Sequence, residues 1–192
     1  MIRDWHDLFR TFNGTVLLTF AAAPPAALLV CVLALWRRAR GTASAWRLSL
    51  AEVGMVYGTV PWVWMTMLPG SRAGQVPGRV SLVPLRDLLS MSPWQIAGNL
   101  LVFAALGFFA PLRFSRLASL PRIVGFAAAC SVLIELAQYV LRLDRVSSVD
   151  DVLVNALGAG LAALASRAWW REASTFRGHI ENRIRTGNTP SS

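Results

Sequence analysis

The hydrophobic positions of this chain form five long apolar runs, separated by short segments rich in arginine, aspartate, glycine and proline. The runs cover residues 15–36, 48–67, 96–112, 123–141 and 152–170. A helix that crosses the hydrocarbon core of a bilayer needs about 20 predominantly apolar residues, and each run comes close to that length. The pattern therefore predicts an all-α fold, a polytopic bundle with about five transmembrane helices.

Composition favours a membrane protein and argues against other classes. Hydrophobic residues make up 55% of the chain and charged residues 15%, whereas soluble domains carry about 25% charged residues. The 19 cationic residues are all arginine and lie between the apolar runs, so we expect no nucleic-acid partner. Cys31 and Cys130 lie inside apolar runs, and no Cys/His cluster occurs. We therefore expect neither a disulfide, nor a zinc-type metal site, nor a cofactor.

The arginines also predict the orientation of the chain in a bacterial cytoplasmic membrane. The segments that flank the runs fall alternately on the two sides of the membrane and so form two sets. One set carries 12 arginines and the other carries 7. The first set is 37–47, 113–122 and 167–192, and the second is 1–14, 68–95 and 142–151. Because cytoplasmic loops carry the excess of cationic residues, we expect the N-terminus outside and the C-terminus in the cytoplasm.

The same pattern divides the chain into four regions. Residues 1–14 form an extracytoplasmic segment, which is either an interfacial helix with apolar residues at helical spacing or a frayed polar tail. Residues 15–67 hold two transmembrane helices, and residues 68–170 hold three more. Residues 171–192 form a basic cytoplasmic tail.

Polar side chains within the last three runs are the candidate functional residues, because each costs free energy in lipid unless it has a partner or a role. On the predicted topology Glu135 lies about 9 Å from the outer end of its helix. Gln138 follows one turn nearer the surface on the same face. Asn155 lies one turn deeper than Asp151, and Asn99 lies about one turn into the third run. These groups are all expected in the outer half of the membrane.

The loops at the same predicted end add Arg86 and Arg145, and Asp150 precedes the fifth run. Asp150 is equally explained as a helix cap favoured by the N-terminal dipole. The carboxamide side chains of Asn99, Gln138 and Asn155 can likewise be explained as packing contacts between helices. Glu135 instead needs a cation, a proton or a water-filled cavity, so it is the best candidate for a catalytic residue. The predicted binding pocket comprises Arg86, Asn99, Glu135, Gln138, Arg145, Asp150, Asp151 and Asn155.

Three stretches together resemble the VanZ-like family, small membrane proteins named after an accessory factor in teicoplanin resistance. They are Leu82-Val83-Pro84-Leu85, then Gly98-Asn99-Leu100-Leu101-Val102-Phe103, and finally Ile134-Glu135-Leu136-Ala137-Gln138 followed by Arg145, Asp150-Asp151 and Asn155. The order Glu-x-x-Gln, Arg, Asp-Asp, Asn is the specific part of this signal. Members often carry another Asp where this chain has Ser148, and the loss of that charge weakens a metal-site interpretation.

The resemblance implies a cell-envelope role, with teicoplanin tolerance as the family phenotype, and supplies no reaction. Our first hypothesis is a binding role, in which the pocket holds an envelope lipid headgroup or a glycopeptide and arginines meet its phosphate or carboxylate. The alternative is an intramembrane enzyme acting on a lipid-linked substrate, with Glu135 as general acid–base or with Glu135, Asp151 and Asn155 holding a divalent cation. A proton-coupled transporter ranks last, because no inverted repeat supports it. Membrane lipids are the expected partners, and the sequence leaves the oligomeric state and the question of catalysis open.

Overall fold

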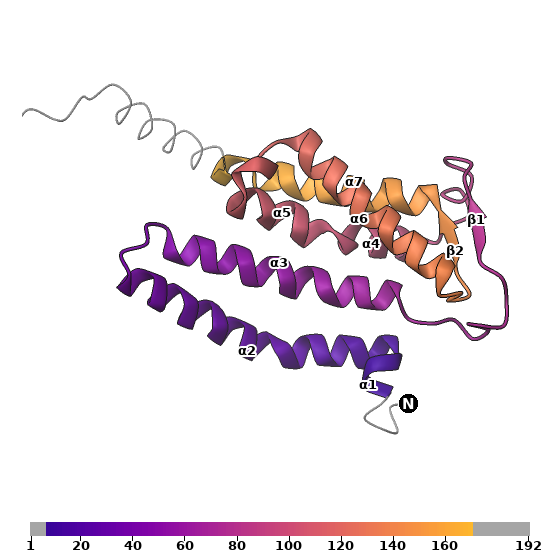
Figure 1. The fold of residues 1–192 in the computed structure, drawn as a ribbon, viewed down its shortest axis with the longest axis horizontal. Coiled ribbons are helices and arrows are strands. Elements are labelled where there is room, and N and C mark those ends of the chain that lie inside the picture. The colour runs from indigo at the N-terminus through magenta and orange to yellow at the C-terminus, as the bar shows by residue number, and fades with distance from the viewer. Residues whose placement is uncertain (1–6, 171–192) are drawn as a thin grey trace, which may run out of the picture.

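The computed structural model describes residues 7–170, which fold as a bundle of helices (Figure 1). The main helices are α2 (Phe12–Ala39), α3 (Ala45–Thr66), α4 (Pro93–Val102), α5 (Ala104–Arg113), α6 (Leu120–Val140) and α7 (Val149–Ala165). Helices α2 and α3 form an antiparallel hairpin along one side, and α3 packs against α5 of the group α4–α7. The predicted all-α bundle is confirmed. The predicted tail 171–192 and the first six residues of the N-terminal segment lie outside the described residues.

Three helices of the described chain are long and apolar enough to cross a membrane. They are α2, the pair α4–α5 taken together as Pro93–Arg113, and α6. Helix α3 has 22 residues but carries Arg47 and Glu52, and α7 has only 17 residues. Helices long and apolar enough to span a membrane are thus present as predicted, and the number of five spans stays a prediction.

The third apolar run is interrupted, although its sequence pattern predicts one continuous helix over 96–112. Helix α4 ends at Val102 and α5 begins at Ala104, and Phe103 between them has φ −116° and ψ 13°. The Phe103 side chain is 3% exposed and packs in a buried cluster with Val102, Ala127 and Ala159. An apolar residue at the break continues the apolar pattern, so hydrophobic periodicity gives no sign of the interruption.

Two glycines let α7 lie directly against α4 and α5. A Cβ atom at Gly158 would meet the Leu100 carbonyl oxygen at 2.0 Å, and one at Gly107 would meet the Ala159 carbonyl oxygen at 2.1 Å. Neither position has room for any side chain. Small residues allow this kind of close backbone approach between membrane helices, and here they bring the polar faces of α4 and α7 together.

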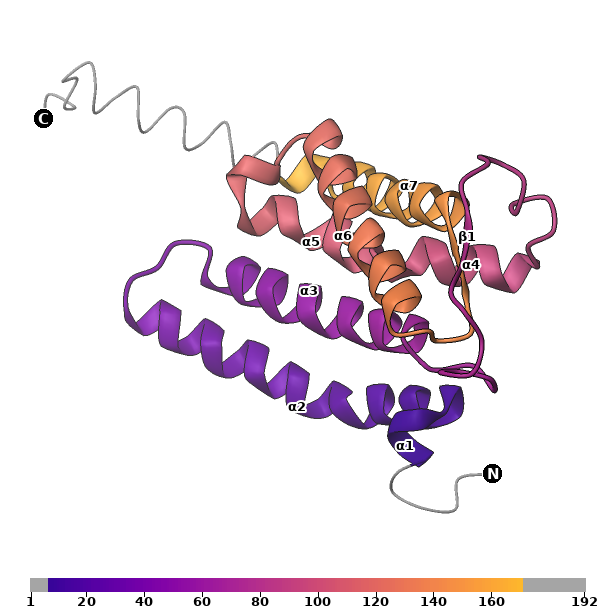
Figure 2. The same ribbon diagram turned by 45° about the vertical axis from the view of Figure 1, so that its right-hand side comes forward.

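The two ends of the bundle differ in their connections (Figures 1 and 2). One end carries α1 (Asp7–Arg10) and two short strands, β1 (Arg79–Ser81) and β2 (Val146–Ser148). The strands pair in parallel, although the sequence pattern predicts loops there. We call this the strand end. The other end, called the turn end, carries the α2–α3 connection and the short helix η1 (Ser115–Leu117).

Candidate functional site

Glu135 is a buried acid near the strand end of α6, with 9% of its surface exposed. Its Oε2 accepts a hydrogen bond of 3.0 Å from the backbone N–H of Ser148, and its carbonyl oxygen accepts one of 2.8 Å from the Ser147 hydroxyl. Strand β2 therefore lies directly across the last turns of α6. Asp151 and Arg145 lie close enough to act on the Glu135 carboxylate electrostatically.

Asp151 lies in the first turn of α7 and faces α4. Its Oδ1 accepts a hydrogen bond from the side-chain amide of Asn99, so the third and fifth apolar runs meet through polar groups. The carboxylates of Asp151 and Glu135 come from two packed helices and lie within electrostatic range of each other. Because like charges repel, this arrangement favours a cation or a hydrogen-bond donor between them.

Asn155 lies one turn deeper in α7 than Asp151 and is 3% exposed. Its Nδ2 donates a hydrogen bond of 2.8 Å to the hydroxyl of Ser131 on α6. Its Oδ1 is buried and accepts no hydrogen bond within the described chain. Buried polar atoms nearly always have a partner, so this oxygen marks a position for a donor from water or from a ligand.

Asp150 holds the loop that leads to α4. Its carboxylate is 1% exposed and accepts backbone N–H bonds from Leu85 at 2.6 Å, Asp87 at 2.9 Å and Leu88 at 2.9 Å. The cap of α7 is Ser148, whose hydroxyl accepts the Asp150 N–H at 3.2 Å. Asp150 therefore fixes a distant loop, and the capping role that the sequence also allowed belongs to Ser148.

Ser148 connects this loop to the buried acids. Its hydroxyl donates a hydrogen bond of 2.7 Å to Asp87 Oδ2. Hydrogen bonds from Ser81 and Ser148, which are partners in the β1–β2 pair, hold the pKa of Asp87 below its usual range. Sequence analysis missed Ser147 and Ser148 as site residues. The available signal was a serine two residues before an aspartate pair at a helix start, a pattern typical of N-caps.

Three residues of the predicted pocket have other surroundings. Gln138 Nε2 donates to the Thr66 carbonyl oxygen at 3.0 Å, and Arg145 Nε donates to the Leu68 carbonyl oxygen at 3.2 Å. The two side chains thus tie the C-terminal end of α3 to the end of α6 and to the loop that follows α6. Arg86 is exposed on the loop beside Asp87.

The structure therefore brings part of the predicted pocket together. This part is Asn99, Glu135, Asp151 and Asn155, with Arg145 at its edge. Together with Ser131, which the sequence analysis did not predict and which bonds to Asn155, we call it the polar cluster. It draws on α4, α6 and α7, so it exists only once these helices have packed. Among residues 7–170, no group of three or more His, Cys, Asp or Glu side chains is placed to hold a metal ion.

The long apolar helices are those of an integral membrane protein, and a buried polar cluster lies between its helices at one end of the bundle. The VanZ/LLP1 family matches residues 55–170, well over half of the chain, and this protein belongs to that family. The matched region contains the whole polar cluster. Neither the search of curated proteins nor the search of solved structures gave a match.

Proposed function

We propose that this cell-envelope membrane protein binds an envelope lipid headgroup or a glycopeptide through its polar cluster. The observation that carries the proposal is the pair of carboxylates, Glu135 and Asp151, which interact across two packed helices beside Arg145. The partnerless Oδ1 of Asn155 lies one turn from Asp151 and offers one more acceptor. A ligand with hydroxyl, amide or ammonium donors complements these oxygens, and its phosphate or carboxylate complements Arg145.

The proposal includes the orientation of the protein. We place the strand end, and the polar cluster with it, on the extracytoplasmic side, with the C-terminus in the cytoplasm. The arginine asymmetry between the two sets of loops supports this orientation. In this orientation the cluster faces the leaflet in which exported lipids and glycopeptides are found. Membership of the VanZ/LLP1 family supports a contribution to teicoplanin tolerance.

An intramembrane enzyme is the second candidate, and one observation favours it. The two carboxylates have different partners, since Glu135 accepts from a backbone N–H and Asp151 from a side-chain amide. Two acids in different surroundings are suited to the separate roles of general acid and general base. The substrate would be a lipid-linked envelope molecule whose bond lies at the depth of Glu135.

Binding is tested with the full-length protein in nanodiscs of phosphatidylethanolamine and phosphatidylglycerol, using teicoplanin as the soluble probe. We expect saturable binding that is lost in Glu135→Gln and in Asp151→Asn. The matched control is Glu52→Gln, which makes the same chemical change at the turn end and should leave binding intact. Unchanged binding in both cluster variants would show that the cluster is not the site.

The enzyme is distinguished from the binding protein by following the lipids themselves. Mass spectrometry of the nanodisc lipids after incubation reports any change of headgroup. A change that stops in Glu135→Gln, while the variant still binds the lipid, would establish catalysis. Lipids that stay unchanged, together with loss of binding in that variant, would support the binding role.

A further inference from the structure

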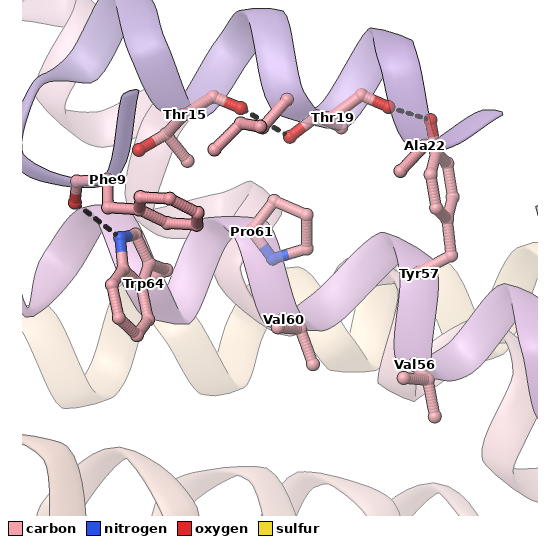
Figure 3. Close-up of a pocket in the computed structure, with 10 residues that line it drawn as sticks. Phe9, Thr15, Thr19, Ala22, Val56, Tyr57, Val60, Pro61 and Trp64 are labelled. Atoms are coloured by element: carbon pink, nitrogen blue, oxygen red, sulfur yellow. Dashed lines mark hydrogen bonds between the residues drawn. The ribbon is translucent and has the colours of Figure 1, made fainter. Parts of the chain in front are cut away.

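A cavity system lies away from the polar cluster, in the seam between α2 and α3 (Figure 3). One part of it, which we call the chamber, is an open groove of about 370 Å³ whose wall residues Val56 and Val60 are more than half exposed. This volume lies within the range of about 300–1,000 Å³ that is typical of ligand pockets. Helix α2 contributes Leu18, Thr19 and Ala22 to the wall, and α3 contributes Val56 and Val60. The chamber is separate from the site described above, because all of its lining residues come from α1, α2 and α3.

The polar groups in the chamber wall are already bonded within the protein. The Thr15 hydroxyl donates to the Thr11 carbonyl oxygen at 3.0 Å, and the Thr19 hydroxyl donates to the Thr15 carbonyl oxygen at 2.8 Å. The Tyr57 hydroxyl reaches across the seam to the Thr19 carbonyl oxygen at 2.8 Å (Figure 3). The chamber therefore presents an apolar surface, which suits a hydrocarbon chain.

Pro61 of α3 lies in the wall of the seam. Its ring lies between the two helices in Figure 3, and it lines both this chamber and a neighbouring cavity of about 330 Å³. Proline has no N–H and cannot bond the carbonyl oxygen four residues earlier, which is that of Tyr57. Thr19 and Tyr57 also line both cavities, so the two spaces lie next to each other in the seam.

The strand end of the chamber continues into a mouth with different chemistry. A cavity of about 430 Å³ shares Phe9 and Trp64 with the chamber and is lined in addition by Arg10, Met67 and Leu68. The Trp64 Nε1 donates a hydrogen bond of 2.9 Å to the Phe9 carbonyl oxygen, which fastens α1 over this mouth. Tryptophan and arginine are typical of the depth at which lipid headgroups lie.

We propose that the α2–α3 seam binds one anionic phospholipid of the surrounding bilayer, with an acyl chain in the chamber and its phosphate against Arg10. A guanidinium pairs well with phosphate, and the apolar part of the seam ends at this cation. The bilayer is the source of the ligand, because none of the most apolar stretch of α2 is buried by other parts of the protein. The proposal does not depend on the polar cluster, so either can fail without the other.

The test uses the full-length protein in phosphatidylcholine nanodiscs that contain a minor fraction of phosphatidylglycerol with a diazirine on one acyl chain. After irradiation, mass spectrometry locates the lipid adducts. We expect adducts on residues 15–22 of α2 and 56–64 of α3, several-fold above those on exposed Leu133 of α6. Unlabelled phosphatidylglycerol should compete, and added phosphatidylcholine should not.

Matched variants separate a built site from ordinary contact with the bilayer. Ala22→Phe fills the chamber and should abolish these adducts, whereas Ala21→Phe adds the same ring one residue away, outside the lining, and should leave them. Val60→Phe fills the chamber from α3 and repeats the test if the first variant does not fold. Arg10→Gln should remove the preference for phosphatidylglycerol, and Arg38→Gln at the turn end should retain it.

Several results would overturn the proposal. Adducts spread evenly over exposed helix faces, or kept in both chamber-filling variants, would mean bulk lipid only. Adducts that show no preference for phosphatidylglycerol would refute the anionic headgroup at Arg10. Protein–protein cross-links across the seam in place of lipid adducts would assign it to a second copy of the chain.

Discussion

The two ends of the bundle stabilise their acidic side chains in different ways. At the strand end, Asp150 and Glu135 accept hydrogen bonds from backbone N–H groups. At the turn end, Glu52 forms ion pairs with the side chains of Arg37 on α2 and Arg113 on α5. Backbone amides are fixed in position once the chain has folded, whereas each arginine must be ordered to make its contact.

The difference shows what each end is built to do. The ion pairs of Glu52 join α2, α3 and α5, and both carboxylate oxygens have arginine partners. The backbone bonds of Asp150 and Glu135 fix the loop around Leu85 and strand β2 over the bundle. The turn end therefore holds three helices together through side-chain ion pairs, and the strand end fixes a loop and a strand through backbone amides.

The largest expected effect concerns which end faces the cytoplasm. In a background without Cys31 and Cys130, a cysteine replacing Ser44 at the turn end should be shielded from an impermeant thiol reagent in intact cells. A cysteine replacing Ser71 at the strand end should react fully, because the arginine distribution places that loop outside. Gel-shift labelling, with permeabilised cells as the control, measures both. Labelling of the Ser44 variant in sealed cells would reverse the orientation.

The second prediction weakens the strand end. Asp150→Ala removes three charge-assisted hydrogen bonds to the loop that leads to α4, so we expect the free energy of unfolding to fall by about 3 kcal/mol. Thermal unfolding in detergent micelles measures the change. Salt should have little effect on it, because the Asp150 carboxylate is buried and its partners are backbone amides. A loss as small as that of an exposed residue would show that the loop does not depend on Asp150.

The third prediction makes the corresponding change at the turn end. Glu52→Ala breaks two ion pairs that are partly exposed to solvent, so we expect a loss of about 1 kcal/mol. Added salt should reduce the difference from the wild type, because salt screens exposed charges. The same unfolding assay at low and high ionic strength measures this. A salt-independent loss larger than that of Asp150→Ala would invert the comparison between the ends.

The smallest expected effect is a pH dependence at the strand end. Hydrogen bonds from Ser81 and Ser148 lower the pKa of Asp87 in the folded state. The stability that this carboxylate contributes is present above its unfolded pKa of about 4 and is lost as the pH falls through the lower folded pKa. Thermal unfolding of the wild type and Asp87→Asn should therefore differ at neutral pH and converge in acid. A difference that persists at the lowest pH would contradict this linkage.

Some features of the site follow from local spacing, and others depend on distant contacts. Helical spacing placed Asn155 one turn from Asp151, and the short connection between α6 and α7 made these helices neighbours. The structure agrees in bonding Asn155 to Ser131 across this pair. Gln138 shares a face of α6 with Glu135, yet it bonds to Thr66 at the end of α3. Spacing gives the face of a helix, and the neighbouring element decides which partner that face meets.

The sequence by itself determined the helical membrane class, the alternation of loops between the two ends and the polar residues of α4, α6 and α7, because these depend on local hydrophobicity and periodicity. Only the tertiary structure decided that Asp150 binds loop amides, that Ser148 caps α7 and that the third run breaks at Phe103. It also placed the apolar chamber in the α2–α3 seam. These features arise where segments far apart in the chain meet, and backbone amides and close packing leave no pattern in the order of residue types.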